Sequence, residues 1–391
     1  MNDNRIKIGI YFAATLMMGV IGVSGALATI GTHFDKNITM ITFGIISIPC
    51  VVVIPVTLIA GKLMDRFSKK SLTLIGILLI LIGGTVPAFL DSFTAIMVFR
   101  GVFGVGIGFV QSLCSALVAE YFEGEERSRV QGHMTSAQMI GCAIMVFVGG
   151  WLGSVGWNLT FLVYLFAVIS LIGVIVFIPY KKPIYQIPNS EKSTKEPIKI
   201  TKNAWGWIVL MFLFYVIGQV YSNSVSSLVA DREIGNAMQS GLSIAFFCIG
   251  GMITGLIYWR ILAKAGRFTY TLGLLLLVIS YLIMIFGNNI FLIYIGSLIC
   301  GASFSICTPC MIVGTANSVS ARSTAMAVSL SACFQNFAMF ICPIIINPVA
   351  QFVTDKSQDG GLVHSQNALL IAAVMMAIVA IVFMIIVRKR D

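Results

Sequence analysis

Charged side chains are scarce in this chain, since Asp, Glu, Lys and Arg make up 10% of its 391 residues while hydrophobic residues make up 58%. A soluble globular protein of this length needs much more polar surface than this composition supplies. The mean hydropathy of +0.97 is typical of a chain that lies in lipid. These values exclude a soluble globule and predict an integral membrane protein.

Acidic residues are the scarcer charge, with 15 Asp and Glu against 25 Lys and Arg. All the acids fall in loops, in tails or at the ends of apolar segments. Because proton-driven carriers commonly place a carboxylate inside a span, the best remaining candidate for ion coupling is Asp35, beside His33. A solvated loop pair is the alternative interpretation. His133 is a second titratable candidate, with neutral helix packing as its alternative.

Motifs for enzymatic chemistry are absent from the sequence. It contains no Walker phosphate loop, zinc-ligand cluster or nucleophile elbow. Its nine cysteines are scattered through apolar segments, where a free thiol behaves as a small hydrophobe. Cys307 and Cys310 have the spacing of a redox dithiol without the surrounding thioredoxin-like pattern. We therefore predict no enzyme, no resident metal and no cofactor.

The sequence consists mainly of long apolar segments. About 20 consecutive apolar residues are needed to cross the hydrocarbon core as a helix. The first segment follows Arg5 and Lys7, is longer than a signal-peptide apolar region, and is expected to be retained. The sequence thus predicts an all-α integral membrane protein with twelve transmembrane helices in two pseudo-symmetric six-helix bundles. The predicted spans are residues 8–32, 41–61, 72–90, 92–119, 130–153, 156–179, 204–230, 236–260, 270–287, 290–317, 323–350 and 365–387.

A polar connection at residues 180–203, with three prolines and six lysines, divides six spans from six. We interpret it as a solvated cytoplasmic linker. Val20-Ile21-Gly22 in the first span recurs as Val216-Ile217-Gly218 in the seventh. Parallel repeats of six spans describe a transporter better than a receptor or an enzyme. The predicted domains are therefore an N-terminal bundle, residues 1–179, and a C-terminal bundle, residues 204–391.

Basic residues lie mainly on one side of the predicted spans. The other side keeps only Lys36, Arg232 and Lys356. By the positive-inside rule both termini are cytoplasmic, in the cell membrane. This topology accounts for the net charge of +10 through attraction to the inner leaflet, without nucleic-acid binding. The basic residues on the cytoplasmic side are Arg5, Lys7, Lys62, Arg66, Lys69, Lys70, Arg127, Arg129, the six lysines between 181 and 202, Arg260, Lys264, Arg267, Arg322, Arg388, Lys389 and Arg390.

The connection between the second and third spans reads Gly-Lys-Leu-Met-Asp-Arg-Phe-Ser-Lys-Lys at residues 61–70. It resembles the major facilitator superfamily signature Gly-x-Leu-x-Asp-Arg-x-Gly-Arg-Arg, with Ser68 replacing the second glycine. The resemblance implies that Asp65 and Arg66 hold the cytoplasmic ends of neighbouring helices together in an outward-open state. A stop-transfer charge cluster is the alternative. The predicted conformational latch comprises Gly61, Asp65, Arg66, Lys69 and Lys70.

The fourth span contains an element, residues 100–104, that resembles the Arg-x-x-x-Gly motif of drug antiporters in that superfamily. Arg100 is the one clearly intramembrane cation of the sequence. Because a charge is costly in lipid, Arg100 should face the bundle interior or a wet cavity and find a partner. We expect it to act in proton transfer or anion binding. Static hydrogen bonds to backbone carbonyls of neighbouring helices are the alternative.

A third similarity is incomplete. Residues 141–152 resemble the antiporter motif Gly-x-x-x-Gly-Pro-x-x-Gly-Gly-x-Leu, but Met145 and Val146 stand in place of Gly-Pro. Glycine permits close helix approach and proline bends a helix, so their loss weakens the argument for antiport without altering the fold. Residues 157–161 resemble Trp-Arg-x-x-Phe, with Asn158 in place of the charge. Within the superfamily the chain is most similar to bacterial twelve-span drug:proton antiporters.

The substrate cavity is expected between the two halves, near the midplane. The seventh span is unusually polar between Gln219 and Ser227, and uncompensated polarity in lipid is costly, so this stretch should face water or substrate. Interhelical hydrogen bonding is an equally good interpretation of any single member. The predicted substrate-binding residues are Ser24, Thr29, Gln111, Gln138, Tyr215, Gln219, Tyr221, Ser222, Asn223, Gln335 and Asn336, with Phe214 and Phe334 as apolar walls.

Three functional hypotheses remain. The first is a secondary active transporter that exports amphipathic or lipophilic compounds by alternating access with proton coupling. The second is an uptake carrier or facilitator for a small organic anion or metabolite, favoured by the incomplete antiporter motif and the position of Arg100. The third is a nontransporting membrane sensor, which would be expected to carry a soluble signalling domain. We expect a monomer whose partners are a small-molecule substrate, protons and the lipid bilayer.

Overall fold

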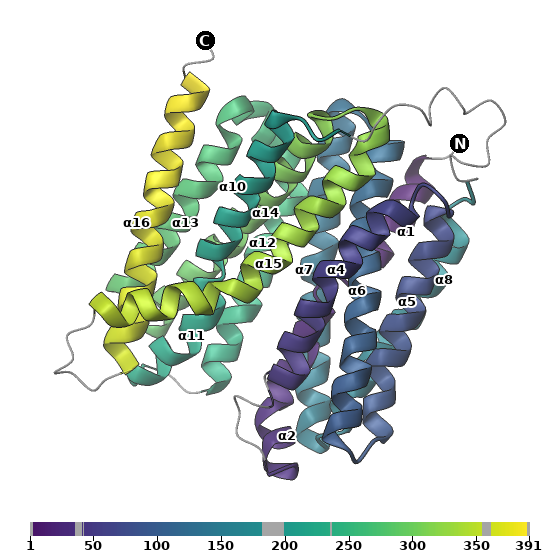
Figure 1. Ribbon diagram of the computed structural model, residues 1–391. Coiled ribbons are helices and arrows are strands. Elements are labelled where there is room, and N and C mark those ends of the chain that lie inside the picture. Colours follow the sequence, from purple (N-terminus) through teal and green to yellow (C-terminus); the bar gives the residue numbers. More distant parts are fainter. Residues whose placement is uncertain are drawn as a thin grey trace. The chain divides into compact units, whose positions relative to one another are not determined.

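The computed structural model describes residues 3–35, 41, 43–181, 199–234, 237–353 and 361–388, and these residues form helices and turns with no strand (Figure 1). They divide into two compact units. Unit 1 is Met1–Ile208 with Ile312–Phe337, and unit 2 is Val209–Met311 with Ala338–Asp391. Most of the predicted linker, residues 182–198, lies outside the described residues, so the two predicted bundle boundaries remain a prediction.

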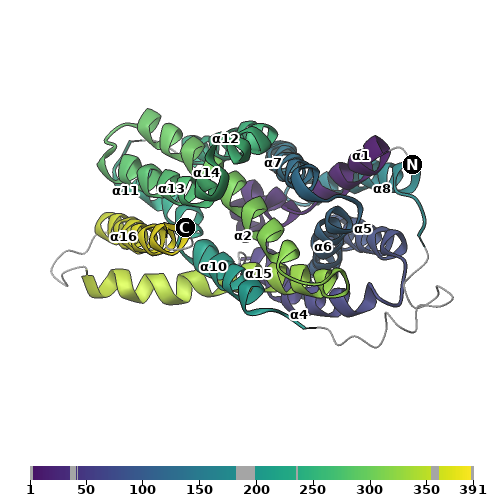
Figure 2. The same cartoon turned by 90° about the horizontal axis from the view of Figure 1, so that it is seen from above.

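Unit 1 is built around one long, central helix. This helix, α6, has 78% of its most apolar window buried and packs against α4 and α5. Figure 2 shows α5 beside α6, and α1 beside α8. The elements of unit 1 in chain order are α1 (Asp3–Ala14), η1 (Gly19–Ala26), α2 (Leu27–His33), η2 (Phe43–Ser47), α4 (Ile48–Leu63), α5 (Lys69–Thr85), η3 (Val86–Phe89), α6 (Phe93–Tyr121), α7 (Gly124–Val155), η4 (Leu159–Leu165) and α8 (Phe166–Phe177).

Glycine allows α5 and α6 to approach closely. A Cβ atom placed on Gly106 of α6 would meet the carbonyl oxygen of Gly76 on α5 at 2.6 Å. No larger residue fits at such a contact without moving one of the helices. Gly104, Gly106 and Gly108 of α6, each with a neighbour closer than 3.0 Å to an added Cβ atom, therefore serve helix packing.

Four predicted spans of unit 1 are not regular α-helices along their whole length, and one of these, the third span, ends in the 3₁₀ segment η3. The first changes to 3₁₀ geometry over η1, the second opens with the π-helical turn η2, and the sixth opens with the 3₁₀ segment η4. A Cβ atom on Gly22 in η1 would meet the Cβ atom of Met145 on α7 at 3.1 Å, so η1 packs tightly on its neighbour. Such irregular turns leave carbonyl groups without their usual helical donors.

Unit 2 contains α11 (Val220–Asp231), α12 (Ala237–Ala265), η6 (Gly266–Phe268), α13 (Thr269–Phe286) and α16 (Gly361–Arg388). Helix α16 packs against α13 and α11. Three further helices have parts in both units: α10 (Lys202–Gly218), α14 (Ile290–Asn317) and α15 (Ala321–Val353).

The described residues contain eleven helical segments long and apolar enough to span a membrane. One of them, Gln239–Phe286, is 48 residues long and comprises α12 and α13, joined where Gly266 takes a positive φ of 51°. At about 1.5 Å per residue it is more than twice as long as the hydrocarbon core is thick, so it crosses twice. The twelve predicted crossings are thus all accounted for.

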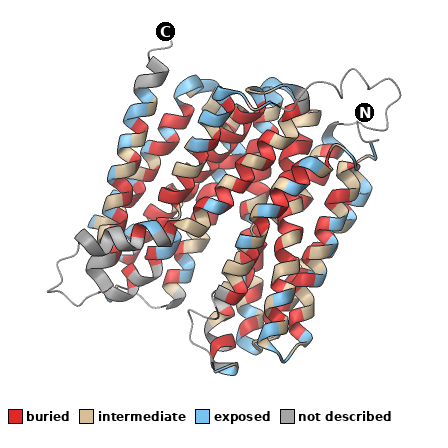
Figure 3. Cartoon of the chain, in the orientation of Figure 1, coloured by how far each residue is buried: buried red, intermediate tan, exposed pale blue. Residues whose placement is uncertain are grey.

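Large apolar side chains remain exposed on the outer helix faces (Figure 3). Phe147 is 78% exposed and Trp151 is 63% exposed, both on α7. A surface of this kind suits lipid contact rather than water. Helix α7 begins at Gly124, before the predicted span that starts at residue 130, and Glu125 and Glu126 in its first turn favour the positive end of the helix dipole.

Candidate functional site

The predicted latch lies at the turn between α4 and α5. Gly61 is buried on α4, and a Cβ atom there would meet the Cβ atom of Ser329 on α15 at 3.0 Å. The two helices therefore approach closely at this point of unit 1. Asp65 is half-buried in the turn, and Arg66 is exposed.

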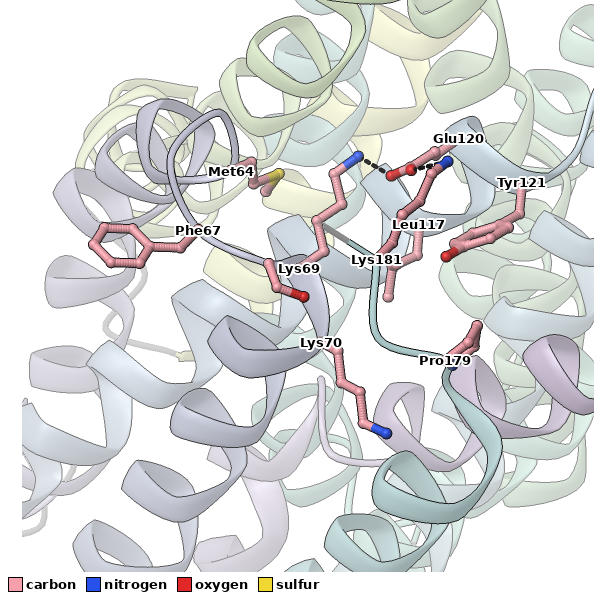
Figure 4. Close-up of a pocket in the computed structure, with 10 residues that line it drawn as sticks. Met64, Phe67, Lys69, Lys70, Leu117, Glu120, Tyr121, Pro179 and Lys181 are labelled. Carbon is pink, nitrogen blue, oxygen red and sulfur yellow. Dashed lines mark hydrogen bonds and ion pairs between the residues drawn. The ribbon is translucent and has the colours of Figure 1, made fainter. Parts of the chain in front are cut away.

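The lysines of this turn connect it to other elements of unit 1. The carboxylate of Glu120, near the end of α6, accepts hydrogen bonds from the ammonium groups of Lys69 and Lys181 (Figure 4). The Lys181 contact, between Nζ and Oε1, measures 2.7 Å. This hydrogen bond raises the pKa of the Lys181 ammonium, and partial burial opposes it less strongly. Lys70 donates to the backbone oxygen of Ile175 at 2.8 Å, in the last turn of α8.

The side chain of Arg127 caps the C-terminal end of α6. Its Nε donates to the backbone oxygen of Phe122 at 2.8 Å, and Nη2 donates to that of Ala119 at 2.7 Å. These carbonyls belong to the helix terminus, where no intrahelical donor follows. Nη1 donates to the side-chain oxygen of Asn317, the last residue of α14. One guanidinium group therefore links α6 to the 312–337 segment within unit 1.

Arg100 is fully buried in unit 1, with 0% of its surface exposed. Its Nε donates to the backbone oxygen of Ile45 at 2.8 Å, and its Nη2 donates to that of Val20 at 3.4 Å. Its Nη1 donates to the hydroxyl of Tyr164 at 3.0 Å. The guanidinium carbon also lies 4.5 Å from the ring centre of Phe103.

The partners of Arg100 all belong to the irregular segments. Ile45 lies in η2, Val20 in η1 and Tyr164 in η4. The Tyr164 hydroxyl in turn donates to the backbone oxygen of Gly19 at 2.8 Å. Arg100 therefore supplies donors to carbonyls that irregular helix geometry leaves available. This is the arrangement of the alternative interpretation, static bonding to backbone carbonyls, and a role in proton transfer or anion binding stays a prediction.

The second predicted coupling residue lies at the surface. Asp35 follows α2, is exposed, and takes a positive φ of 48°. His33 is also exposed, and its ring stacks on Trp157 with 4.3 Å between ring centres. The pair thus lies in a solvent-facing turn.

Predicted substrate residues from distant parts of the sequence meet inside unit 1. The side-chain amide of Asn336 on α15 donates to the side-chain oxygen of Gln111 on α6 at 3.0 Å, and to the backbone oxygen of Ala332 at 2.7 Å. Asn336 and Gln111 are 7% and 6% exposed, and the neighbouring Gln335 is 8% exposed. Phe334, on the same helix, packs edge-on against Trp205. The structure therefore joins Gln111 and Asn336 directly, which their spacing in the sequence does not indicate.

Unit 2 contains five aromatic rings in mutual contact, Phe214, Tyr215, Tyr221, Phe247 and Phe304, here called the aromatic cluster. The ring of Phe304 lies 4.9 Å from Phe214, 5.5 Å from Tyr215 and 5.4 Å from Phe247, measured between centres. Phe247 stacks on Tyr221 at 5.4 Å. Both tyrosine hydroxyls of the cluster are hydrogen-bonded. The hydroxyl of Tyr215 lies 2.9 Å from that of Thr308, and the hydroxyl of Tyr221 donates to the backbone oxygen of Ser243 at 3.0 Å.

The other predicted substrate residues differ in how far they are buried. Asn223 is exposed, and its amide lies 3.5 Å from the sulfur of Cys342. Ser222 is also exposed. The side chain of Thr29 lies outside the described residues. Ser24 on η1, Gln138 on α7 and Gln219 between α10 and α11 are half-buried.

Sequence reasoning missed five side chains that complete these sites. Tyr164 carries a hydroxyl inside the sixth predicted span, and a tyrosine within a span is a usable signal for a buried hydrogen-bonding group. Glu120 and Lys181 were placed only at a helix end and in the linker, because nothing in their spacing indicates that they meet. Phe247 and Phe304 resemble the many other phenylalanines of the spans, and no sequence signal separates them.

Comparison with known protein families identifies the family of this chain. The family described as the Major Facilitator Superfamily matches residues 8–343. The chain belongs to the major facilitator superfamily. Membership confirms the resemblance carried by the 61–70 turn and the predicted fold of twelve helices in two pseudo-symmetric bundles.

Two superfamily proteins are similar over most of their length, and a third over a shorter segment. An uncharacterized MFS-type transporter, YceJ of Bacillus subtilis (strain 168), is 26% identical over 323 residues, which is 80% of each chain. The quinolone resistance protein NorA of Staphylococcus aureus is 22% identical over 297 residues, 73% of this chain and 74% of NorA. The multidrug transporter protein MdtP of Bacillus subtilis (strain 168) is 25% identical over 108 residues, 27% of this chain and 20% of MdtP.

A solved superfamily structure has the same fold. The crystal structure of the transporter FucP in the outward conformation matches with a TM-score of 0.70 and 15% identity, covering 98% of this chain and 99% of FucP. At this identity the likeness shows the fold alone. Fold and family together make the protein a multi-pass membrane transporter of the major facilitator superfamily, a family that carries small molecules and not a family of enzymes.

Proposed function

We propose that this superfamily member is a secondary active transporter that exports amphipathic or lipophilic compounds with proton coupling. It acts by alternating access, as a monomer in the cell membrane with both termini in the cytoplasm. The basic residues on one side of the spans support this orientation. The names of two similar proteins, a quinolone resistance protein and a multidrug transporter, support export of such compounds.

The aromatic cluster of unit 2 is the observation that carries the choice of cargo. All five residues are buried, and three of them retain a small exposed fraction: Tyr215 at 6%, Phe247 at 8% and Phe304 at 7%. Its polar groups are neutral hydroxyls with partners inside unit 2. Aromatic edges with few polar groups bind apolar or planar compounds by stacking and dispersion. A lipophilic substrate therefore suits this surface better than a strongly hydrated one.

The hydrogen bonds that the Arg100 guanidinium already makes favour an uncharged or lipophilic substrate over an anion. Its Nε, Nη1 and Nη2 each donate to a protein oxygen. An anionic substrate would have to replace these bonds and enter a fully buried position, which is costly. The arrangement therefore weakens the anion-uptake hypothesis for the site around Arg100.

Proton coupling needs a group that changes its charge. Within the described spans, acidic residues occur only at helix ends, namely Glu120, Glu125 and Glu126. His133 lies inside α7, is half-buried, and its Nδ1 is 3.3 Å from the hydroxyl of Tyr11 on α1. Histidine is the side chain that titrates closest to neutral pH. His133 is therefore the proton-binding candidate of the described spans, ahead of the exposed Asp35.

The turn at 61–70 acts as the conformational latch of this mechanism. Lys69 and Lys70 tie the start of α5 to α6 and α8, and Gly61 lets α4 approach α15. Contacts that form at helix ends and can break together are suited to stabilising one of two transporter states. The latch controls the rate of alternation and is distinct from the substrate surface.

Flux in proteoliposomes tests the proposed function. Purified protein would be reconstituted with an imposed pH gradient and with cationic, neutral and anionic amphipathic compounds. We expect movement of the cationic or neutral compounds, with simultaneous proton counterflow and loss of flux when the gradient collapses. Downhill movement of an organic anion that is indifferent to pH would contradict the proposal and support the uptake hypothesis.

A further inference from the structure

A pocket of unit 1 lies at the N-terminus of α5, at the end of the spans. Its walls come from the turn after α4, the end of α6 and the segment after α8 (Figure 4). In Figure 4 the side chains of Lys69 and Lys181 both reach Glu120, while Lys70 extends in another direction. The lining residues are Met64, Phe67, Ser68, Lys69, Lys70, Leu117, Glu120, Tyr121, Pro179 and Lys181.

Among the residues that line this pocket, Ser68 has a buried hydroxyl whose hydrogen bonding is not satisfied within the described part of the chain. It is only 5% exposed, and its hydroxyl has no hydrogen-bond partner among the residues that the structure describes. Ser68 precedes the first residue of α5 with an extended backbone, the position of a capping residue, yet its side chain makes no capping bond. A buried hydroxyl without a partner costs free energy, so this group is available to a ligand. The superfamily signature has glycine here, so the hydroxyl is a property of this chain.

The charge of the pocket is positive. Three lysines, Lys69, Lys70 and Lys181, line the pocket together with one acidic residue, Glu120. The 17-residue helix α5 adds the free N–H groups and positive dipole of its first turn, which contains no acidic residue. A helix N-terminus with neighbouring cations and a hydroxyl donor is suited to a phosphate group.

We propose that this pocket binds a phosphate-bearing anion, with the Ser68 hydroxyl donating to a phosphate oxygen and Lys70 supplying charge. The negative charge of Glu120 does not prevent anion binding, because its two oxygens already accept from Lys69 and Lys181. The phosphodiester of an anionic lipid and free phosphate offer the same chemistry. The ends of α5 and α6 lie at the depth where lipid head groups are found. The proposal does not depend on the transported substrate or on proton coupling.

The test measures anion binding by the full chain and by four variants. Purified protein in phosphatidylcholine nanodiscs would receive graded phosphatidylglycerol, and bound lipid would be counted by native mass spectrometry. A second arm would titrate inorganic phosphate into protein in detergent and follow it by calorimetry. Ser68→Ala and Lys70→Gln should each weaken binding roughly tenfold, the effect of one hydrogen bond to a charged group. Lys62→Gln, an exposed lysine of the same turn that does not line the pocket, is the matched control and should change binding less than about twofold.

Each outcome decides the proposal. Selective loss of phosphatidylglycerol in the two pocket variants supports a lipid ligand, and selective loss of inorganic phosphate alone supports a soluble one. Ser68→Thr keeps the hydroxyl and should retain most of the binding, which separates donation of a hydrogen bond from mere packing. Absence of binding in both arms would overturn the proposal. An equal loss in Lys62→Gln and Lys70→Gln would also overturn it, because it would indicate diffuse surface charge.

Discussion

Nη1 of Arg100 donates a 3.0 Å hydrogen bond to the hydroxyl of Tyr164, and that hydroxyl donates to the backbone oxygen of Gly19 at 2.8 Å. The two side chains come from α6 and η4, and together they hold carbonyls of η1 and η2. In a fully buried site such a chain of bonds stabilises the irregular segments, because a buried carbonyl that loses its donor pays the cost of desolvation.

Replacing Arg100 by Met should destabilise unit 1 and abolish transport. The substitution keeps an apolar side chain but leaves the oxygens of Ile45 and Val20 without their donor, at a cost of about 1–3 kcal/mol for each buried group. Thermal unfolding in detergent and proteoliposome flux would measure both effects. Arg66→Met, at an exposed position, should alter stability by less than about 0.5 kcal/mol. A stable and active Arg100→Met protein would exclude the stabilising role.

Replacing Tyr164 by Phe removes one acceptor and one donor from the same network. We expect a loss of about 1–2 kcal/mol in unfolding free energy, since the oxygen of Gly19 loses its donor and one N–H of Arg100 loses its acceptor. The double variant with Arg100→Met should lose less than the sum of the two single effects, because both act on one network. Additive losses would show that the two side chains act independently.

Replacing Glu120 by Gln should slow turnover more than it weakens substrate binding. The substitution removes the carboxylate charge that holds Lys69 and Lys181, and so weakens the latch. Measured rates and apparent affinities separate the two effects. Because Glu120 raises the pKa of Lys181, the stability that this pair contributes is complete below the ordinary lysine pKa of about 10.4 and disappears as the pH rises through the higher folded-state value. Double-mutant cycles at neutral and at strongly alkaline pH should show this decline, and an unchanged coupling energy would contradict it.

Replacing Gly61 by Ala should reduce the transport rate. The new Cβ atom would lie 3.0 Å from the Cβ atom of Ser329, so α4 and α15 must move apart. Gly101→Ala on α6 is the matched control, because no heavy atom lies within 4 Å of its added Cβ atom. The control should be neutral or slightly stabilising, as Ala is the better helix former by about 1 kcal/mol. Equal rates for the two variants would exclude close helix approach at Gly61 as part of the latch.

Replacing His133 by Gln should uncouple transport from protons. Glutamine can still bond to the Tyr11 hydroxyl but cannot change its charge near neutral pH. We expect downhill substrate movement to continue while the imposed pH gradient no longer drives accumulation. Asp35→Asn, in the exposed turn, should leave the response to the gradient intact. If the Asp35 variant alone is uncoupled, then Asp35 is the coupling residue and His133 is not.

Much of the candidate site was accessible to sequence reasoning because lipid penalises polar groups. An arginine in an apolar span must be buried and bonded, and Arg100 is. The 61–70 turn was identified by its charge pattern and its place between two spans. Its partner Glu120 was not, because the meeting of Lys69 with Glu120 depends on how α5 packs against α6. Which backbone carbonyls accept from Arg100 could not be predicted from the sequence either, because they lie in irregular turns that hydropathy does not detect.

Hydropathy and composition alone established a membrane protein with twelve crossings, because a backbone in lipid must bond within its own helix and every crossing needs a long apolar segment. They also indicated which side chains are too polar to face lipid. Side-chain partners were decided only by the packing of helices, where a contact depends on the rotation and depth of both elements. Packing turned Arg100 toward η1, η2 and η4, joined Gln111 to Asn336, and left the hydroxyl of Ser68 in a positively charged pocket.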